Sequence, residues 1–371
     1  MAFIRGLTRL GVIAFFILEM AVFPKAAIAV GRAFPKITAD AAVLIDASTG
    51  VTLFAHNATQ RRPPASTTKI LTSLLALELG DGEETVTVSE KASAVQGAKV
   101  YLQSGDLFYL NDLVKAALIR SGNDAAAAIA EHFGGCPENF VQLMNSKAEI
   151  LGAWRSCFCN PHGLPDDNHL STAYDLALIA RYALKNRLFA QIVATKSEVI
   201  REIRRGRSVY LKNTNRLLWD QPEDIKICGV KTGTTSSAGQ CLVAAGKRKD
   251  NLLISVVLHS TDRYQDTLHL FDYGFNRCIW FEVARGGEPL LILPVWGKSF
   301  GYVTIGSERD LVFAVSPEQL PFLEKRFLFR RFLETPSKPG DRVGCIEVYL
   351  KGHLIASESL VVLDSCFPTI D

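Results

Sequence analysis

The pattern of apolar and polar positions after about residue 36 changes from strand-like to helical and back to strand-like. Two β-like runs surround the turn Ser48-Thr49-Gly50, which is typical of a hairpin. Apolar residues then recur every three or four positions from Ile70 onwards, as on the buried face of a helix. The same period returns in several segments between about 111 and 186, separated by Gly, Pro or Asn breaks. This middle part is predicted to be a helical block.

Strand-like runs follow from about residue 194, and one more helical segment covers residues 263–275. This order predicts an α+β domain over 36–277, in which helices flank an antiparallel sheet and a helical subdomain is attached. After residue 278 the alternating strand pattern returns, with a hairpin tip at Lys351-Gly352. We expect a small all-β domain over 278–371.

The N-terminus has the pattern of an export signal. Two arginines precede an apolar run over 10–18, and small residues end at Ala29, where cleavage is expected. The alternative is a retained membrane anchor, although the run is shorter than the roughly 20 residues of a spanning helix and Glu19 interrupts it. Residues 1–29 are therefore predicted to be a signal peptide, and the protein to work in the cell envelope or outside the cell.

Composition narrows the class of partner. The chain has 371 residues, of which 48% are hydrophobic and 21% charged, a globular composition. The formal net charge of +3 does not favour nucleic acid as a partner. Two basic clusters, at 201–207 and 325–331, are interpreted as solvated faces, with peripheral contact to a membrane or to wall polymers as the alternative.

The candidate chemistry starts at Ser66-x-x-Lys69, at the beginning of the first predicted helix. Ser66 could simply cap this helix. Positions i and i+3 share a helix face, however, so the Lys69 ammonium can reach the Ser66 hydroxyl. A buried lysine that loses its charge can act as a base towards such a serine.

Two further motifs give the pair a context. Ser121-x-Asn123 lies between two predicted helices, and Lys231-Thr232-Gly233 closes a strand-like run. A hydroxyl in such a loop can relay a proton, while a lysine and a threonine on an edge strand can bind a carboxylate. Glycine lets the strand approach a ligand closely. In this order the three motifs are those of serine β-lactamases and penicillin-binding proteins.

Several further segments carry a specific resemblance. They are residues 160–184, 213–219, 231–239 and 261–275. With them, the chain over 36–371 resembles the low-molecular-weight penicillin-binding proteins that act as D-alanyl-D-alanine carboxypeptidases. The resemblance implies a penicillin-binding/β-lactamase-like catalytic domain followed by that family's β-rich second domain, and it implies no cofactor and no metal.

The resemblance also implies a reaction. Ser66 would be the acylated nucleophile, Lys69 the general base and Ser121 the proton relay, while Asn123 would contact a substrate amide. The substrate would be the D-Ala-D-Ala end of a peptidoglycan stem pentapeptide, from which the terminal D-alanine leaves before water hydrolyses the acyl-enzyme. Penicillins would acylate the same serine as covalent inhibitors.

The remaining site residues are assigned by the same resemblance. Lys231 would hold the relay electrostatically, and Thr232 with Arg263 would bind the terminal carboxylate. Gly233 would allow close approach, and the amides of Ser66 and Thr234 would form the oxyanion hole. The resemblance also implies a structural role for His162, in this family's loop.

Other functions share some of these features. A serine β-lactamase of class A would need an added carboxylate for deacylation, and no Glu-x-x-Leu-Asn segment lies between the second and third motifs. An inactive wall-binding scaffold would not need the complete set of catalytic side chains. A D,D-endopeptidase acting on cross-links would use the same reaction with a bulkier leaving group, and it stays open.

Two structural alternatives concern cysteines. Two cysteines and two histidines between 157 and 169 suggest zinc, but their spacing fits a structural zinc site poorly. Cys228 and Cys241 could face each other across a hairpin, although buried thiols are favoured in a chain of this size. Members of the resembled family often end in an amphipathic membrane-lying helix, whereas residues 360–371 show no helical period. We therefore expect either a released protein or one that an uncleaved leader attaches to the membrane.

Overall fold

The computed structural model describes residues 15–21, 34–296, 301–330, 333–334 and 338–366. The chain divides into two compact units. One contains Val30–Cys278 and is called the α+β unit below. The other contains Ile279–Asp371 together with Met1–Ala29 and is called the β unit.

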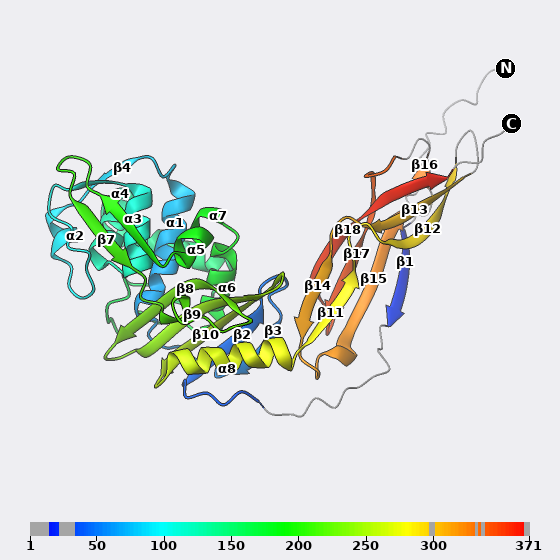
Figure 1. The fold of residues 1–371 in the computed structure, drawn as a ribbon, viewed down its shortest axis with the longest axis horizontal. Helices are drawn as coiled ribbons and strands as arrows, with labels where there is room; N and C mark the ends of the chain where they lie inside the picture. Colours follow the sequence, from blue (N-terminus) through cyan, green and yellow to red (C-terminus); the bar gives the residue numbers. More distant parts are fainter. Residues whose placement is uncertain (1–14, 22–33, 297–300, 331–332, 335–337, 367–371) are drawn as a thin grey trace, which may run out of the picture. The chain divides into compact units, whose positions relative to one another are not determined.

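An antiparallel five-stranded sheet forms the centre of the α+β unit, in the order β3-β2-β10-β9-β8 (Figure 1). Its strands are β2 (Ala41–Asp46), β3 (Thr52–His56), β8 (Lys226–Thr235), β9 (Gly239–Arg248) and β10 (Asn251–Ser260). The interior strands read as nearly continuous apolar runs because helices cover both faces of the sheet.

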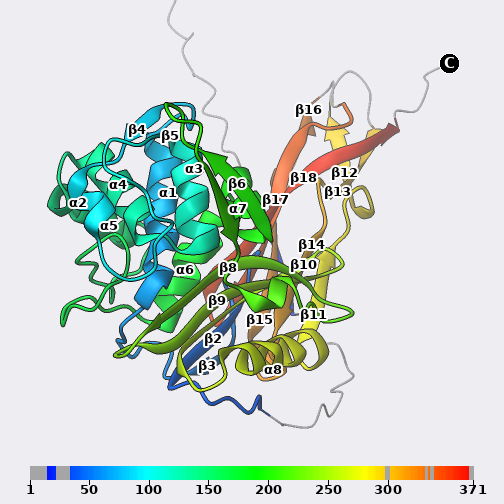
Figure 2. The same ribbon diagram turned by 60° about the vertical axis from the view of Figure 1, so that its left-hand side comes forward.

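Different helices cover the two faces of this sheet. Helix α8 (Arg263–Asn276) covers one face, and α1 (Lys69–Leu79) and α6 (Ala173–Ala183) lie on the other (Figure 2). Alternate residues of β2 divide between the faces, since Val43 belongs to the core shared with α1 and α6 while Leu44 lies under α8. The three candidate motifs are found on the α1 face and at the β8 edge.

The predicted hairpin at Ser48-Thr49-Gly50 is confirmed, because β2 and β3 pair across it. The Asp46 carboxylate accepts a hydrogen bond from the Thr49 amide at 2.8 Å. Gly50 has φ +79°, a value that side chains disfavour. Local turn chemistry therefore forms this corner.

The predicted helical block is also confirmed. It contains α3 (Leu110–Lys115), the π-helical turn η2 (Ala116–Arg120), α4 (Asn123–Gly134), α5 (Pro137–Ile150) and α6, and α7 (Arg187–Ala194) follows. Beside it lie α2 (Glu90–Ala94) and a short pair, β4 (Thr85–Thr87) with β5 (Leu107–Tyr109). The alanines of α4 from Ala125 to Ala130 are buried, which lets neighbouring helices approach closely.

Two of the predicted strands after residue 194 do not join the central sheet. They pair with each other as a separate hairpin, β6 (Ser197–Arg201) with β7 (Ser208–Lys212). Their exposed and buried residues alternate, as expected for a ribbon with one face in solvent. Periodicity alone predicts a strand but does not say which sheet it enters.

The described elements of the β unit are strands and one 3₁₀ turn, η4 (Leu320–Phe322), as expected from its alternating sequence pattern. A seven-stranded sheet has the order β1-β15-β17-β18-β13-β12-β16, and β11 pairs with β14 (Figure 1). The strands are β11 (Ile279–Ala284), β12 (Pro289–Trp296), β13 (Gly301–Ser307), β14 (Leu311–Val315), β15 (Leu323–Arg330), β16 (Leu333–Glu334), β17 (Arg342–Leu350) and β18 (His353–Cys366). The hairpin predicted at Lys351-Gly352 is confirmed, with Leu350 opposite His353 and positive φ at both turn residues.

Part of the predicted export signal lies in the described structure. Phe15–Ala21 form β1, which pairs antiparallel with β15 at one edge of the large sheet. The rest of the predicted signal lies outside the described residues, and its cleavage stays a prediction. Among the described helices, none has the length and hydropathy needed to cross a bilayer.

Candidate active site

Ser66 and Lys69 lie at the entrance to α1. The 3₁₀ turn η1 (Ala65–Thr68) directly precedes the helix, and Ala65 has φ +48°, an uncommon value for a residue with a side chain. Lys69 Nζ lies 3.0 Å from Ser66 Oγ. The structure therefore brings together the hydroxyl and the amine that the i, i+3 spacing predicts.

Lys69 is fully buried and has three hydrogen-bond partners. Besides Ser66, its Nζ contacts Asn123 Oδ1 and the His162 carbonyl oxygen, each at 2.7 Å. Burial holds the pKa of Lys69 well below its usual value; the charge of Lys231 lowers it further, and the Asp124 carboxylate raises it. A neutral amine in this position has the lone pair needed to take a proton from Ser66.

Ser121 and Asn123 come from the junction of η2 and α4. Ser121 has φ +69° and is buried, and α4 begins at Asn123. The Asn123 amide nitrogen donates to Ala98 O at 2.7 Å, and Asn123 Nδ2 donates to Gln96 O at 2.6 Å. Asn123 therefore connects Lys69 to the loop that precedes β5.

The third motif lies on β8, at the edge of the central sheet. Lys231 is buried, and burial, followed by the charges of Arg263 and Arg120, lowers its pKa to about 7. Lys231 Nζ donates to Thr232 O at 3.0 Å. A Cβ built on Gly233 would lie 3.0 Å from the Ser66 amide nitrogen, so glycine allows β8 to approach Ser66 without crowding.

Thr232, Thr234 and Arg263 give this edge its polar side chains. Thr232 Oγ1 lies 2.6 Å from Thr214 Oγ1. Arg263, the first residue of α8, donates through Nη1 to Gly233 O and Thr234 Oγ1, both at 2.8 Å. A guanidinium beside two hydroxyls is a suitable environment for a carboxylate.

The loop after α5 packs against the backbone of Ala65 and Ser66. Gly163 has φ +86°, and a Cβ there would lie 1.9 Å from Ala65 O. Burial lowers the pKa of His162 to about 3 and that of His169 to about 4, so both are neutral at physiological pH. His169 Nε2 lies 2.8 Å from Thr68 Oγ1.

The structure describes both the cysteine and histidine cluster at 157–169 and the Cys228 and Cys241 thiols. His169 Nδ1 accepts a hydrogen bond from the Cys159 amide at 3.0 Å, so both ring nitrogens have protein partners. Within the described ranges, no group of three or more His, Cys, Asp or Glu side chains is arranged to hold a metal ion. Cys228 and Cys241 are free thiols, and Cys241 is buried.

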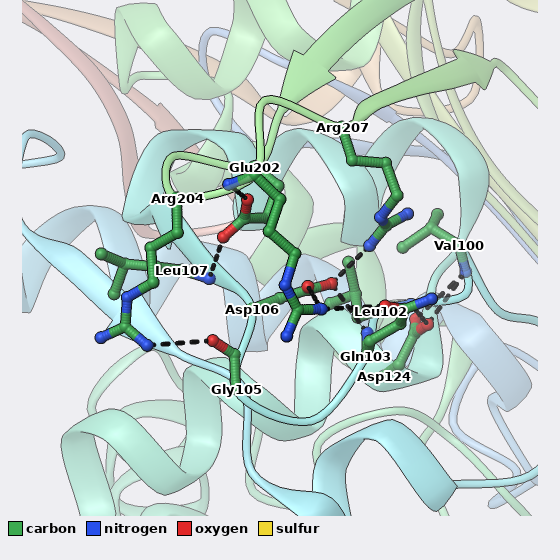
Figure 3. Close-up of polar contacts among 11 residues, drawn as sticks. Val100, Leu102, Gln103, Gly105, Asp106, Leu107, Asp124, Glu202, Arg204 and Arg207 are labelled. Carbon is green, nitrogen blue, oxygen red and sulfur yellow. Dashed lines mark hydrogen bonds and ion pairs between the residues drawn. The ribbon is translucent and has the colours of Figure 1, made fainter.

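Three residues important to the site are not among the predicted site residues. Thr214 and Gly163 act through contacts that no local pattern reveals, although both lie in segments that carry the family resemblance. Asp124 follows Asn123 directly, and its buried carboxylate accepts hydrogen bonds from the amides of Val100 and Leu102 (Figure 3). Its place in the Ser-Gly-Asn-Asp segment is the one sequence signal that could have singled it out.

Comparisons with known proteins identify the relatives of both units. The family model described as D-alanyl-D-alanine carboxypeptidase matches residues 28–262. The model described as penicillin-binding protein 5, C-terminal domain, matches residues 281–366. The resemblance stated from the motifs and the expected fold class are both confirmed.

Individual relatives cover most of the chain. D-alanyl-D-alanine carboxypeptidase DacF of Bacillus subtilis is 31% identical over 327 residues, 86% of this chain and 83% of the relative. The structure of penicillin-binding protein 5 from Haemophilus influenzae has a TM-score of 0.68 at 31% identity and covers 90% of this chain and 99% of its own. The Streptomyces K15 DD-transpeptidase structure has a TM-score of 0.61 at 31% identity, over 66% of this chain and 99% of its own. The chain therefore belongs to the D-alanyl-D-alanine carboxypeptidase family.

Proposed function

We propose that this protein is a serine-type carboxypeptidase that removes the terminal D-alanine from peptidoglycan stem pentapeptides through an acyl-enzyme at Ser66. The observation that carries the proposal is the Ser66–Lys69 pair. The amine is fully buried, its pKa is lowered, and its nitrogen lies 3.0 Å from the serine oxygen. These are the conditions under which lysine activates a nucleophile.

Acylation begins when Ser66 Oγ attacks the carbonyl carbon of the peptide bond between the two D-alanines. Lys69 takes the hydroxyl proton, and the new oxyanion is stabilised by the amides of Ser66 and Thr234. The proton held by Lys69 passes through the Ser121 hydroxyl to the leaving nitrogen as the peptide bond breaks, so Lys69 is neutral again. D-alanine departs, and the rest of the peptide is bound to Ser66 as an ester.

Substrate orientation depends on the terminal carboxylate. Thr232, Thr234 and Arg263 bind it through hydrogen bonds and charge, while Gly233 lets the backbone of β8 lie beside the peptide. The Lys231 ammonium, present below its pKa of about 7, adds positive charge to this field and holds Ser121. These roles require a free carboxylate after the scissile bond, which favours a carboxypeptidase over a cut in the middle of a peptide.

Deacylation uses water. Water attacks the ester carbonyl with Lys69 as the base. The bond to Ser66 Oγ then breaks, Lys69 returns the proton to this oxygen, and the shortened peptide is released with a new carboxylate. Asp124 has a carboxylate near Lys69, but its oxygens bind the Val100 and Leu102 amides. It is therefore unsuited to activate water as the added glutamate of a class A β-lactamase does, which favours slow release of penicillins.

A peptidoglycan substrate requires that the protein acts outside the cytoplasm. Peptidoglycan lies outside the cytoplasmic membrane, and the predicted signal over residues 1–29 would deliver the protein there. A peripheral contact with the membrane or the wall is compatible with this location. β-Lactams would reach the same serine as covalent inhibitors.

The central experiment incubates the protein with a fluorescent penicillin and, separately, with a stem pentapeptide. We expect a covalent adduct on Ser66 that lasts minutes or longer, and release of D-alanine. Ser66→Ala should lose the adduct and reduce D-alanine release by about 10⁴-fold or more. Ser208→Ala, an exposed serine on β7, is the matched control and should behave as wild type.

Three outcomes would contradict the proposal. A covalent adduct in Ser66→Ala would place the nucleophile elsewhere. Rapid turnover of penicillin would favour a β-lactamase. Cleavage of cross-linked dimers without release of D-alanine from pentapeptides would identify an endopeptidase.

A further inference from the structure

The loop between α2 and β5, residues 96–106, packs directly on the turn that contains Ser121 and Asn123. A Cβ built on Gly97 would lie 2.7 Å from Asn123 Nδ2. A Cβ built on Gly122 would lie 3.3 Å from the side chain of Val100. The loop therefore forms the border of the candidate site next to Asn123.

Within this loop, the Asp124 carboxylate holds the backbone on both sides of Tyr101. Asp124 is fully buried, and it accepts hydrogen bonds from the amides of Val100 and Leu102, each at 3.1 Å (Figure 3). Hydrogen bonds to a charged acceptor are about twice as strong as neutral ones. One residue of the catalytic helix α4 thus fixes the position of Tyr101.

The far end of the loop is fixed by the tip of the β6–β7 hairpin. Asp106 is buried, accepts a hydrogen bond from the Gln103 amide at 2.8 Å and forms an ion pair with Arg207 (Figure 3). The Leu107 amide donates to Glu202 Oε1 at 3.0 Å. The basic segment 201–207 therefore anchors this loop, and only part of it is a solvated face.

Tyr101 itself has an unusual conformation for a residue of its size. Its φ is +61°, and its side chain is 76% exposed. A bulky residue adopts such a φ only when its surroundings impose it, and strained positions cluster at ligand-binding sites. Ala65 and Ser121, which adjoin or belong to the catalytic group, also have positive φ. The fold thus fixes the backbone that carries an exposed tyrosine at the border of the site.

We propose that Tyr101 is a substrate-binding residue whose ring contacts the part of the stem peptide on the N-terminal side of the two D-alanines. The inference rests on the proposed function, in which the terminal carboxylate lies against Thr234 and Arg263. The loop borders the site at Asn123 instead, so it meets the acyl portion of the substrate. An aromatic ring supplies a large contact area, and the rigid backbone means that little entropy is lost on binding.

The test compares two substrates, a lysine-containing stem pentapeptide and N-acetyl-D-alanyl-D-alanine. The measured quantity is the ratio of kcat/KM for the long substrate to that for the short one. In Tyr101→Ala this ratio should fall about tenfold, through a higher KM for the pentapeptide. Tyr101→Phe keeps the ring and should restore the ratio to within about twofold of wild type.

Tyr101→Gly separates binding from folding. Glycine tolerates φ +61° without strain, so the thermal midpoint should stay at or above that of the wild type while the ratio still falls. Tyr210→Ala removes another exposed tyrosine of the same unit, on β7 and without a positive φ, and should leave the ratio unchanged.

Failure of the Tyr101 role and failure of the proposed carboxypeptidase function would give different results. An unchanged ratio in Tyr101→Ala, or an equal loss on both substrates with a lowered midpoint, would overturn the role of Tyr101 alone. A wild-type protein that neither forms a penicillin adduct nor releases D-alanine would overturn the proposed function, and this inference with it.

Discussion

Lys69 is a buried amine between charges of opposite sign. Lys231 lies on one side and lowers its pKa, whereas Asp124 raises it. His162 and His169 also face it, but burial lowers the pKa of each to about 4 or less, so they are uncharged at working pH. The protonation of Lys69 therefore depends mainly on its burial, on Lys231 and on Asp124.

The opposing charges predict pH shifts of opposite direction. Lys69 must be neutral to act as a base, so acylation by penicillin should increase with pH as Lys69 loses its proton. The acid limb is the pH range over which the acylation rate constant rises. Asp124→Asn removes the charge that raises the pKa of Lys69, so this limb should move to lower pH. Lys231→Gln removes the charge that lowers it, and the limb should move to higher pH.

Acylation rate constants between about pH 5 and about pH 9 would measure these limbs. Asp112→Asn, which changes a carboxylate paired with Lys115 on α3, is the control and should not move the limb. Shifts of the same direction in Asp124→Asn and Lys231→Gln would contradict the electrostatic account.

At the scale of elements, the loop after α5 and the strand β8 converge on the start of α1. Gly163 packs against Ala65 from one side, and Gly233 approaches Ser66 from another. The Gly163 contact leaves no room for a side chain and the Gly233 contact is tight, so η1 is held between two backbones. This close packing explains how Ala65 can hold its positive φ.

Gly163→Ala should break this arrangement. Its Cβ would lie 1.9 Å from Ala65 O, at φ +86°, and we expect a loss of about 3 kcal/mol of unfolding free energy together with slower acylation of Ser66. Gly135→Ala is the matched control, because Gly135 has φ +70° but nothing within 4 Å of a built Cβ. It should lose only about 1 kcal/mol.

Urea unfolding and penicillin acylation would be measured on both variants. Equal losses of stability in Gly163→Ala and Gly135→Ala would show that backbone conformation, and not contact with η1, determines the cost.

The β unit has an edge that depends on processing. Strand β1 lies within the predicted signal and pairs with β15. If residues 1–29 are removed, β15 becomes the edge strand of its sheet. Lys325 and Arg326 on β15 are charges of the kind that discourages edge-to-edge association of sheets.

At the scale of the whole molecule, every candidate catalytic residue belongs to the α+β unit. This unit has a buried core of its own, which extends through α1, α4, α6 and the central sheet. In the Streptomyces K15 DD-transpeptidase structure, 66% of this chain matches 99% of that chain, which is about the share of this chain that the α+β unit contains.

A fragment of residues 30–278 should therefore fold and react. We expect penicillin to acylate it at Ser66 at a rate within about threefold of the full chain, since the core and the site are complete without the β unit. The same fragment with Ser66→Ala is the control for specific labelling. A folded fragment that is not acylated would mean that the β unit contributes to the site.

Local sequence patterns predict the type of many elements, including the hairpins. The hairpins at Ser48-Thr49-Gly50 and Lys351-Gly352 were predictable because turn residues act on their immediate neighbours. The β6–β7 hairpin was predicted as strands, but its separation from the central sheet depends on packing with residues far along the chain. The same limit applies to Asp124, whose partners at 100 and 102 have no mark in the sequence.

By itself, the sequence determined the order of the three motifs, the shared helix face of Ser66 and Lys69, and the family to which they belong. These properties depend on residue type and spacing, which are local. Only the tertiary structure decided that Lys69 is buried against Asn123 and His162, 54 and 93 residues away. It also decided that Tyr101 is held exposed by Asp124. Burial and the resulting change of pKa come from atoms that distant segments supply, so they arise only when the chain is folded.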